Sequence, residues 1–321
     1  MTAAVRSSSL RFSAPLRAPA CRRQVCVLAL LASLACSSHA QVLLVQPGTT
    51  DPDALNFNPA FIARNGVQEI QGQPMVKRDN EPMRERKEKH LFRFGTDGRT
   101  SYSNHSFGSP GSGRDTASIA YSYEAHDRVI EELHNDLAGH FALTRALDDS
   151  GRTTRETYAR VENLGTDRYH LVPGRRTEIS DEMFRYEAIN DTAWKRVFVN
   201  SAGLPYREQV WSSDQWGYLR AIHDRWLVTG RMGLITFRYD EKGRLAERIE
   251  QSDLSSPATI KHLWRYDIAG NVILCDRWRN DVQLEHREYI YEEGTMFLKA
   301  TVAKHMDTGL IHIVRYATVG R

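Results

Sequence analysis

The chain has 321 residues, a formal net charge of +3 and four cysteines. Residues 1–40 contain five arginines and no acid, which leaves 38 basic and 40 acidic side chains beyond them, a charge of −2. This balance excludes the strongly basic surface of a nucleic-acid-binding protein. Only Cys275 lies beyond residue 40, so a disulfide-rich scaffold is excluded as well.

Residues 1–40 predict a secretory signal peptide. A basic lead precedes an apolar run at residues 25–35, and Ser38-His39-Ala40 supplies the small residues of a cleavage site. We expect cleavage between Ala40 and Gln41, and export to the periplasm, the cell surface or the medium. Lipidation at Cys36 stays open. The apolar run is shorter than the roughly 20 residues that span a bilayer, and no later run is long enough, so no transmembrane segment is expected after processing.

Residues 41–89 predict an N-terminal lead-in with a strand, a helix and a charged stretch. Residues 42–45 are apolar and favour a strand. Asn58 suits a helix cap, Pro59 the first helical position and Gly66 the left-handed exit, so one short helix is expected at residues 58–66. Residues 77–89 alternate in charge, which is typical of a solvated loop or strand pair.

Residues 90–321 predict a domain of β-hairpin repeats. The clearest unit is Phe237-Arg238-Tyr239-Asp240-Glu241-Lys242-Gly243-Arg244-Leu245. Its two aromatic side chains share one strand face, Asp240 suits the opening of a type I turn, and Gly243 can take the positive φ that closes it. The same structural turn is expected at Asp267 and Gly270, and at Glu292 and Gly294.

The spacing of these turns sets the expected fold. Turn-opening residues occur at Asp97, Glu124, Asp148, Asn200, Asp240, Asp267 and Glu292, at intervals of 27, 24, 52, 40, 27 and 25 residues. A period near 25 fits one hairpin per repeat. The 40-residue interval is irregular and suggests an insertion. We therefore expect an all-β fold of consecutive antiparallel β-hairpins, forming a broad curved sheet, an open barrel or a sandwich, with one short N-terminal helix.

The recurring Tyr-Asp-x-x-Gly-[Arg/Asn]-[Leu/Val] core resembles the YD repeat of RHS-type secreted proteins. It is carried by Tyr239-Asp240-Glu241-Lys242-Gly243-Arg244-Leu245 and by Tyr266-Asp267-Ile268-Ala269-Gly270-Asn271-Val272. The resemblance covers residues 90–316 and implies hairpins laid side by side in long curved sheets that bind or encapsulate. The chain departs from the family in having too few repeats to close a shell, and no extra domain is expected after the last hairpin.

The sequence contains no catalytic motif and predicts no cofactor or metal. His134 and His140 lie in a β pattern that need not bring them together, so a metal site is not expected. Glu285-His286-Arg287-Glu288 is interpreted as a solvated strand face rather than an acid/base pair. Cys275 lies in the apolar run Val272-Ile273-Leu274-Cys275 and is expected to be a buried small side chain.

Tryptophans are the best candidates for binding. Trp211, Trp216 and Trp226 lie close in sequence, and exposed indoles stack on sugar rings or peptides. The leading hypothesis is an exported, non-catalytic binding or structural protein whose partner is a carbohydrate or another exported protein. Two alternatives stay open: an exported hydrolase of glycan or cell-wall material, and a protective partner that caps a toxin through an open sheet edge.

Overall fold

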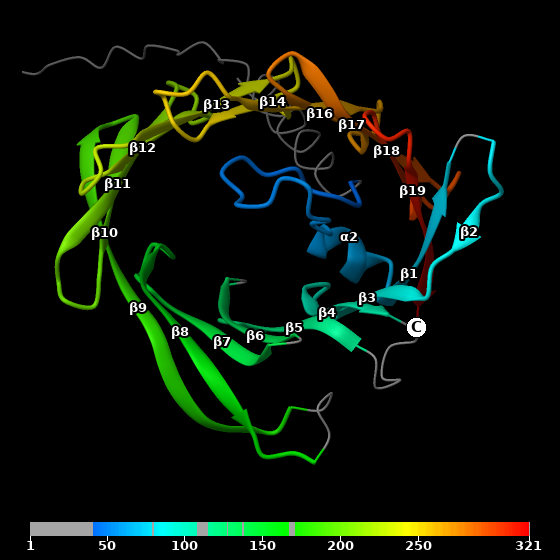
Figure 1. Cartoon of the computed structure of the whole chain (residues 1–321), viewed down its shortest axis with the longest axis horizontal. Coiled ribbons are helices and arrows are strands. Elements are labelled where there is room, and N and C mark those ends of the chain that lie inside the picture. The colour runs from blue at the N-terminus through cyan, green and yellow to red at the C-terminus, as the bar shows by residue number, and fades with distance from the viewer. Residues whose placement is uncertain are drawn as a thin grey trace, which may run out of the picture. The chain divides into compact units, whose positions relative to one another are not determined.

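A computed structural model describes residues 41–78, 80–107, 115–126, 128–136, 138–166 and 171–320. The predicted signal peptide and Cys36 lie outside these residues. The described strands belong to one antiparallel sheet (Figure 1). Its strands are β1 (Val67–Lys77), β2 (Arg84–Glu85), β3 (Glu88–Phe94), β4 (Thr100–Phe107), β5 (Asp115–Tyr123), β6 (Val129–Asp136), β7 (Gly139–Leu147), β8 (Thr153–Asn163), β9 (Pro173–Asn190), β10 (Ala193–Val199), β11 (Pro205–Ser213), β12 (Leu219–Trp226), β13 (Met232–Tyr239), β14 (Leu245–Gln251), β15 (Ile260–Tyr266), β16 (Val272–Arg279), β17 (Val282–Tyr291), β18 (Leu298–His305) and β19 (Ile311–Gly320).

The sheet closes on itself as a barrel. From β3 to β19 each strand pairs with its neighbours in sequence, and β1 joins the two ends by pairing with both β3 and β19. Only the short β2 lies outside the ring, against β1. The all-β meander of antiparallel hairpins is therefore confirmed, whereas the open sheet, open barrel or sandwich is wrong. Closure pairs the backbone groups that the two end strands would otherwise expose.

The Asp-x-x-Gly segments lie at the hairpin turns. In the turn between β13 and β14, Gly243 donates its N–H to the carbonyl oxygen of Asp240 over 2.9 Å, and Asp240 Oδ1 accepts the N–H groups of Lys242 and Arg244. Gly243 has a φ of +76°. The arrangement recurs where Gly270 donates to Asp267, over 3.2 Å.

Three turns differ from their expected form. The turn expected to open at Asp97 opens instead at Gly95, whose carbonyl oxygen accepts the N–H of Gly98 over 3.0 Å. The turn after Glu292 is longer, because the N–H that reaches the carbonyl oxygen of Glu292 belongs to Met296. The interval expected to contain an insertion instead contains three strands, β11, β12 and β13, one more than each of the next two intervals, because it includes the β11–β12 hairpin. Its turn begins at Asp214, whose carbonyl oxygen accepts the N–H of Gly217 over 3.0 Å. The insertion is therefore wrong, and one turn of the series was missed.

The N-terminal segment packs against the inner face of the barrel (Figure 1). The predicted helix is confirmed as α2 (Pro59–Arg64), and Asn58 caps it by accepting the N–H of Ala60 over 3.1 Å. The expected strand at residues 42–45 is wrong, because Leu43 forms only an isolated bridge with Phe57. Buried apolar residues of this segment join inward-facing aromatics of the wall in one core: Val42, Leu43, Phe57, Phe61, Ile62, Phe92, Phe237, Trp264, Tyr289 and Tyr316.

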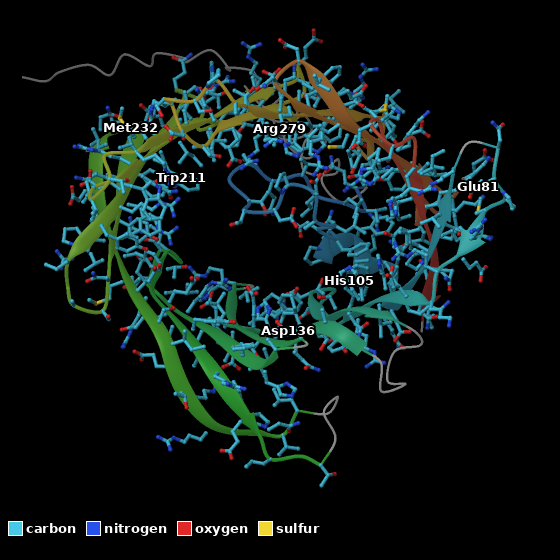
Figure 2. All side chains as sticks on the ribbon, viewed as in Figure 1. Glu81, His105, Asp136, Trp211, Met232 and Arg279 are labelled. Carbon is cyan, nitrogen blue, oxygen red and sulfur yellow. The ribbon has the colours of Figure 1, made fainter. Side chains whose placement is uncertain are left out.

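Side chains cover both faces of the barrel wall (Figure 2). Successive side chains of a strand point to opposite faces, so the core residues define which positions face inward. The outer face carries cross-strand ion pairs. Three of these pairs are Arg155–Asp181 at 2.7 Å, Arg176–Glu131 at 2.6 Å and Lys195–Glu187 at 2.8 Å.

Candidate ligand-binding site

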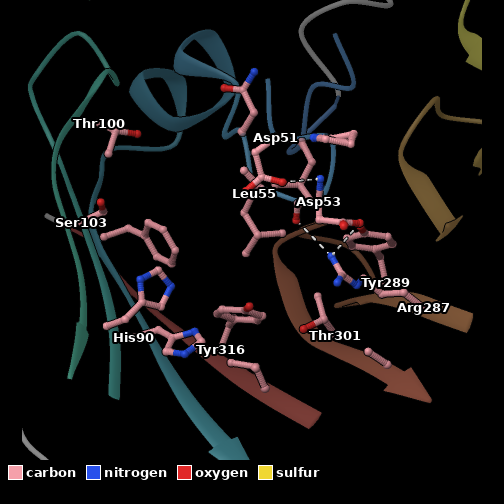
Figure 3. A pocket seen from close by; sticks show the side chains of 18 of the residues that line it. Asp51, Asp53, Leu55, His90, Thr100, Ser103, Arg287, Tyr289, Thr301 and Tyr316 are labelled. Carbon is pink, nitrogen blue, oxygen red and sulfur yellow. Dashed lines mark hydrogen bonds and ion pairs between the residues drawn. The ribbon is translucent and has the colours of Figure 1, made fainter. Parts of the chain in front are cut away.

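A cavity of about 800 Å³ lies inside the barrel, between the N-terminal segment and a wall made mainly by β3–β5 and β17–β19 (Figure 3). Its volume is in the range of small-molecule sites. Apolar and polar side chains share its lining. They include Leu43, Val45, Leu55, Phe92, Ile119 and Val314 on the apolar side, and Ser103, Tyr289, Thr301 and Tyr316 among the hydrogen-bonding groups.

One edge of the cavity is formed by residues 46–56, here called the inner loop. Its base is fixed where the N–H of Leu44 donates to the carbonyl oxygen of Asn56 over 2.8 Å. Near its start Gly48, with φ +77°, lies so close to Trp211 of β11 that a Cβ would stand 3.0 Å from the indole ring. Asp53, near its end, contacts β16 and β17. The inner loop therefore bridges two distant parts of the wall.

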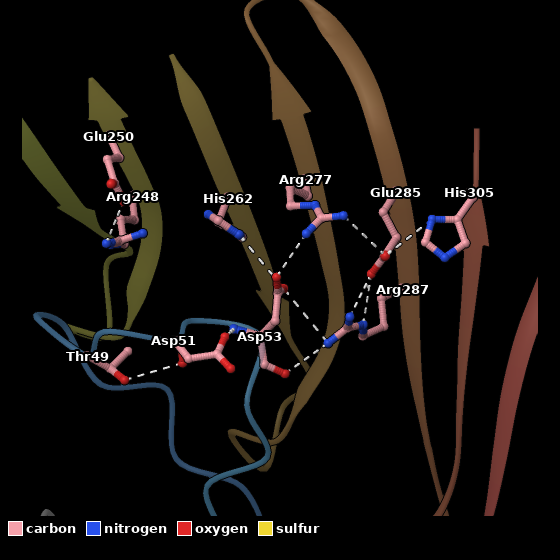
Figure 4. Close-up of polar contacts among 10 residues, drawn as sticks. All are labelled: Thr49, Asp51, Asp53, Arg248, Glu250, His262, Arg277, Glu285, Arg287 and His305. Atoms are coloured by element: carbon pink, nitrogen blue, oxygen red, sulfur yellow. Dashed lines mark hydrogen bonds and ion pairs between the residues drawn. The ribbon is translucent and has the colours of Figure 1, made fainter. Parts of the chain in front are cut away.

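Asp53 is held by basic side chains of three adjacent strands (Figure 4). Arg277 Nη1 donates to its Oδ2 over 3.2 Å, Arg287 Nη1 donates to its backbone oxygen over 3.0 Å, and His262 Nε2 lies 3.8 Å from Oδ1. Burial raises the pKa of Asp53, but His262, Arg287 and Arg277 outweigh burial and lower this pKa to about 2. Asp53 is therefore ionised at neutral pH.

Glu285 is the second carboxylate of this cluster. It is 5% exposed and lies 2.7 Å from Arg287, 3.6 Å from Arg277 and 3.7 Å from His305. The solvated strand face expected at residues 285–288 is therefore wrong for Glu285 and Arg287. They alternate with His286 and so face inward together, towards the core.

These groups form a row of direct cross-strand neighbours on the inner wall. The row runs through Arg248, His262, Arg277, Glu285 and His305, one from each strand between β14 and β18. His262 is 3% exposed, yet neither of its ring nitrogens forms a hydrogen bond with another described residue. The same holds for Nε of Arg248 and of Arg277. Since a buried polar group without a partner costs about 1–3 kcal/mol, this row has unused binding capacity.

The structure does not bring the three candidate tryptophans together. Trp211 faces inward and stacks on Trp194, with ring centroids 5.0 Å apart. Trp216 lies in the β11–β12 turn and is 77% exposed. Trp226 lies at the far end of β12, where its ring contacts the guanidinium groups of Arg207 and Arg231. Trp216 and Trp226 are thus at opposite ends of one strand.

The other residues singled out from the sequence carry no site. His134 and His140 lie on opposite faces, because His134 pairs with Phe141 across β6 and β7. No group of metal-ligating side chains occurs in the part of the chain that the structure describes. Cys275 is buried, and burial raises the pKa of its thiol to about 12. Among the described residues, no helix has the length and apolar character needed to cross a membrane.

Sequence reasoning missed Asp53, His262 and Arg277. Asp53 and Arg277 are 224 positions apart, so their contact depends on closure of the barrel. A weaker signal was present in the strands themselves. Arg277 and Arg287 occupy positions on the same strand faces as Cys275 and Tyr289, where an alternating pattern predicts apolar residues.

The comparisons with known proteins are weak. The chain matches no protein family and no curated protein. Among solved structures it is similar to a porin-like protein from Bacteroides uniformis, with 14% identity and a TM-score of 0.36 over 79% of this chain and 98% of that one. A porin-like protein from Bacteroides vulgatus has 8% identity and a TM-score of 0.33 over 78% of this chain and 98% of that one. A LolA superfamily protein from Nitrosomonas europaea has 10% identity and a TM-score of 0.18 over 79% of this chain and 84% of that one. Identities and TM-scores this low carry no argument about function.

The resemblance to the YD repeat of RHS-type proteins is wrong. No family match supports it. The barrel is also closed by pairing of β1 with β19, rather than laid out as a long open sheet. The Asp-x-x-Gly turn is what a tight hairpin of this length requires, so it does not distinguish one hairpin family from another.

Proposed function

We propose that this chain is an exported, non-catalytic binding protein that encloses a small amphipathic ligand inside its barrel. The observation that carries the proposal is the cavity of about 800 Å³, whose lining combines apolar side chains with a few convergent polar groups. This combination is typical of sites that bury the body of a ligand and orient it through hydrogen bonds. Arg287 and Asp53 place the charged cluster at the edge of the same cavity.

The outer face supports action in an aqueous compartment. Ion pairs such as Arg155–Asp181 and Lys195–Glu187 lie on the outer face of the strands. Charged side chains of this kind are stable in water and costly to bury. Together with the signal peptide expected at residues 1–40, this favours an exported protein, in the periplasm, at the cell surface or in the medium.

The two alternative functions have less support. A glycosidase needs one carboxylic acid with a raised pKa, whereas every described carboxyl group with a clearly shifted pKa is shifted downward, Asp53 and Glu132 included. A cap that binds a toxin through an open sheet edge needs unpaired strands. Here β1 and β19 pair with each other.

The proposal can be tested by filling the cavity. Ala303 lines the cavity, and the next residue, Lys304, points to the outer face. Wild-type protein from the exported fraction should retain a small molecule that native mass spectrometry detects. Ala303→Trp should lose this molecule and Lys304→Trp should keep it. Equal retention by the two variants would contradict binding in this cavity.

A further inference from the structure

We propose that Arg277, Arg287 and His262 form the recognition site for a carboxylate-bearing ligand, and that Asp53 of the inner loop occupies this site in place of the ligand carboxylate. The inference rests on the proposed function, because the ligand is the one that the barrel cavity encloses. It places the charged end of that ligand at these three side chains of the wall, and it identifies the ligand's chemical class as an alkyl carboxylate.

Basic side chains of three adjacent strands surround Asp53. Two guanidinium groups from adjacent strands contact it, Arg277 at a carboxylate oxygen and Arg287 at the backbone oxygen, while His262 approaches the other carboxylate oxygen. Guanidinium groups are well suited to carboxylate recognition, because their N–H donors match the two oxygens. Glu285 binds both arginines from the other side and holds them in place.

His262 is the second observation that points to a ligand. Its side chain is almost fully buried, and neither ring nitrogen has a hydrogen-bond partner among the described residues, although Nε2 is directed at Asp53. Asp53 therefore satisfies the site only in part. A carboxylate that is free to shift towards His262 could accept the hydrogen bond that Asp53, fixed by its own backbone, does not accept.

The residue that occupies the site belongs to a segment outside the sheet. The inner loop is irregular from residue 46 to residue 56 and is fixed at its base by Leu44 and Asn56. Within it Asp51, Ala54 and Asn56 are exposed, in contrast to the buried anchors that flank the loop. Moving the loop would uncover the arginines without breaking any strand pairing of the barrel.

The cavity beside the arginines defines the rest of the ligand. Arg287 lies in its lining together with Leu43, Val45, Leu55, Ile119 and Val314. A ligand whose carboxylate replaced that of Asp53 would place its body against these apolar side chains. An alkyl carboxylate combines the two features, whereas a neutral alcohol of equal length has only the apolar one.

The test uses octanoate and 1-octanol as probes, with full-length processed protein and isothermal titration calorimetry. Asp53→Asn removes the competing charge, and we expect it to bind octanoate about tenfold more tightly than the wild type, with the affinity for 1-octanol unchanged. Asp51→Asn is the matched control. It removes an equal charge from the same loop, at a side chain that accepts only the N–H of Asp53 in this network, and it should behave as the wild type.

Three outcomes would overturn the inference: an unchanged octanoate affinity in Asp53→Asn, a gain shared by 1-octanol, or an equal gain in Asp51→Asn. If Asp53→Asn does not fold, Arg277→Gln decides instead. It should weaken octanoate binding about tenfold and spare 1-octanol, and an unchanged octanoate affinity would refute the site. Loss of the co-purified ligand from Ala303→Trp combined with an unchanged octanoate affinity in Asp53→Asn would leave the binding function intact and remove only this carboxylate site.

Discussion

The hydroxyl group of Tyr266 donates a 2.6 Å hydrogen bond to the carbonyl oxygen of Leu245, a residue of the preceding hairpin. The same bond joins Tyr239 to Leu219 and Tyr291 to Val272, over 2.9 Å and 2.7 Å. In each case the tyrosine directly precedes the residue that opens the turn. The Tyr-Asp pair therefore has a structural reason: one residue forms the turn, and the other ties its hairpin to the one before.

We expect Tyr266→Phe to lower the free energy of unfolding by about 1–2 kcal/mol. The substitution keeps the ring but leaves the carbonyl oxygen of Leu245 without this donor. Urea denaturation followed by circular dichroism measures the change. Tyr218→Phe is the control, at a tyrosine that is 39% exposed, and should cost less than about 0.5 kcal/mol. Equal losses in the two variants would show that the bond to Leu245 contributes nothing.

The contact between α2 and the β3–β4 turn predicts a second effect. Gly98 has a φ of +80°, and a Cβ there would lie 2.0 Å from the carbonyl oxygen of Pro59 in α2. Gly203 has nearly the same φ, +79°, with nothing within 4 Å of its Cβ position. Gly203→Ala should therefore cost about 1–2 kcal/mol, the backbone penalty alone. Gly98→Ala should cost at least about 2 kcal/mol more, because the helix must move away. Thermal and urea unfolding of both variants would measure the difference, and equal costs would refute the close contact.

The turns and the strands between them were predictable from sequence because both depend on local chemistry. Asp240 binds N–H groups two and four residues ahead of it, so its role is contained within a few positions. The helix at Asn58 is local in the same way. The turn at Asp214 has the same Asp-x-x-Gly pattern, in Asp214-Gln215-Trp216-Gly217, and was equally predictable from sequence.

The site could not be predicted in this way, because it depends on closure of the sheet. Pairing between β1 and β19 joins the two ends of the sheet, and an alternating pattern alone does not show whether a sheet is open or closed. The same closure brings Asp53 to Arg277 and turns Glu285 from an apparent surface residue into a buried one. Charged residues at strand positions that share a face with aromatic residues were the sequence signal for an internal polar site.

The tryptophans of the β11–β12 hairpin should differ in what they contribute. Trp211 stacks on Trp194 and packs against Gly48, so Trp211→Ala should cost about 3 kcal/mol of stability. Trp216 is exposed in the turn, and Trp216→Ala should change stability by less than about 0.5 kcal/mol. If the exposed indole binds carbohydrate, as the sequence predicts, Trp216→Ala should also abolish binding on a glycan array. Binding that persists in this variant would remove Trp216 from the candidate binding residues.

The ionisation of Asp53 makes stability depend on pH in a defined window. Its pKa falls from 3.8 in the unfolded chain to about 2 in the folded protein, where His262, Arg287 and Arg277 outweigh the effect of burial. A lowered carboxyl pKa stabilises the folded state above the unfolded value, and the contribution disappears as pH falls from about 4 to about 2. We expect wild type to exceed Asp53→Asn by about 2 kcal/mol at pH 6, and this difference to vanish near pH 2.

Chemical denaturation of both proteins between pH 2 and pH 6 measures this difference directly. Burial also lowers the pKa of His90, to about 4, which makes both proteins less stable as pH falls below about 6.5. His90 is present in both proteins, so its contribution cancels when their free energies of unfolding are subtracted. A difference that stays constant with pH, or grows as pH falls, would contradict an ionised Asp53 held by Arg277 and Arg287.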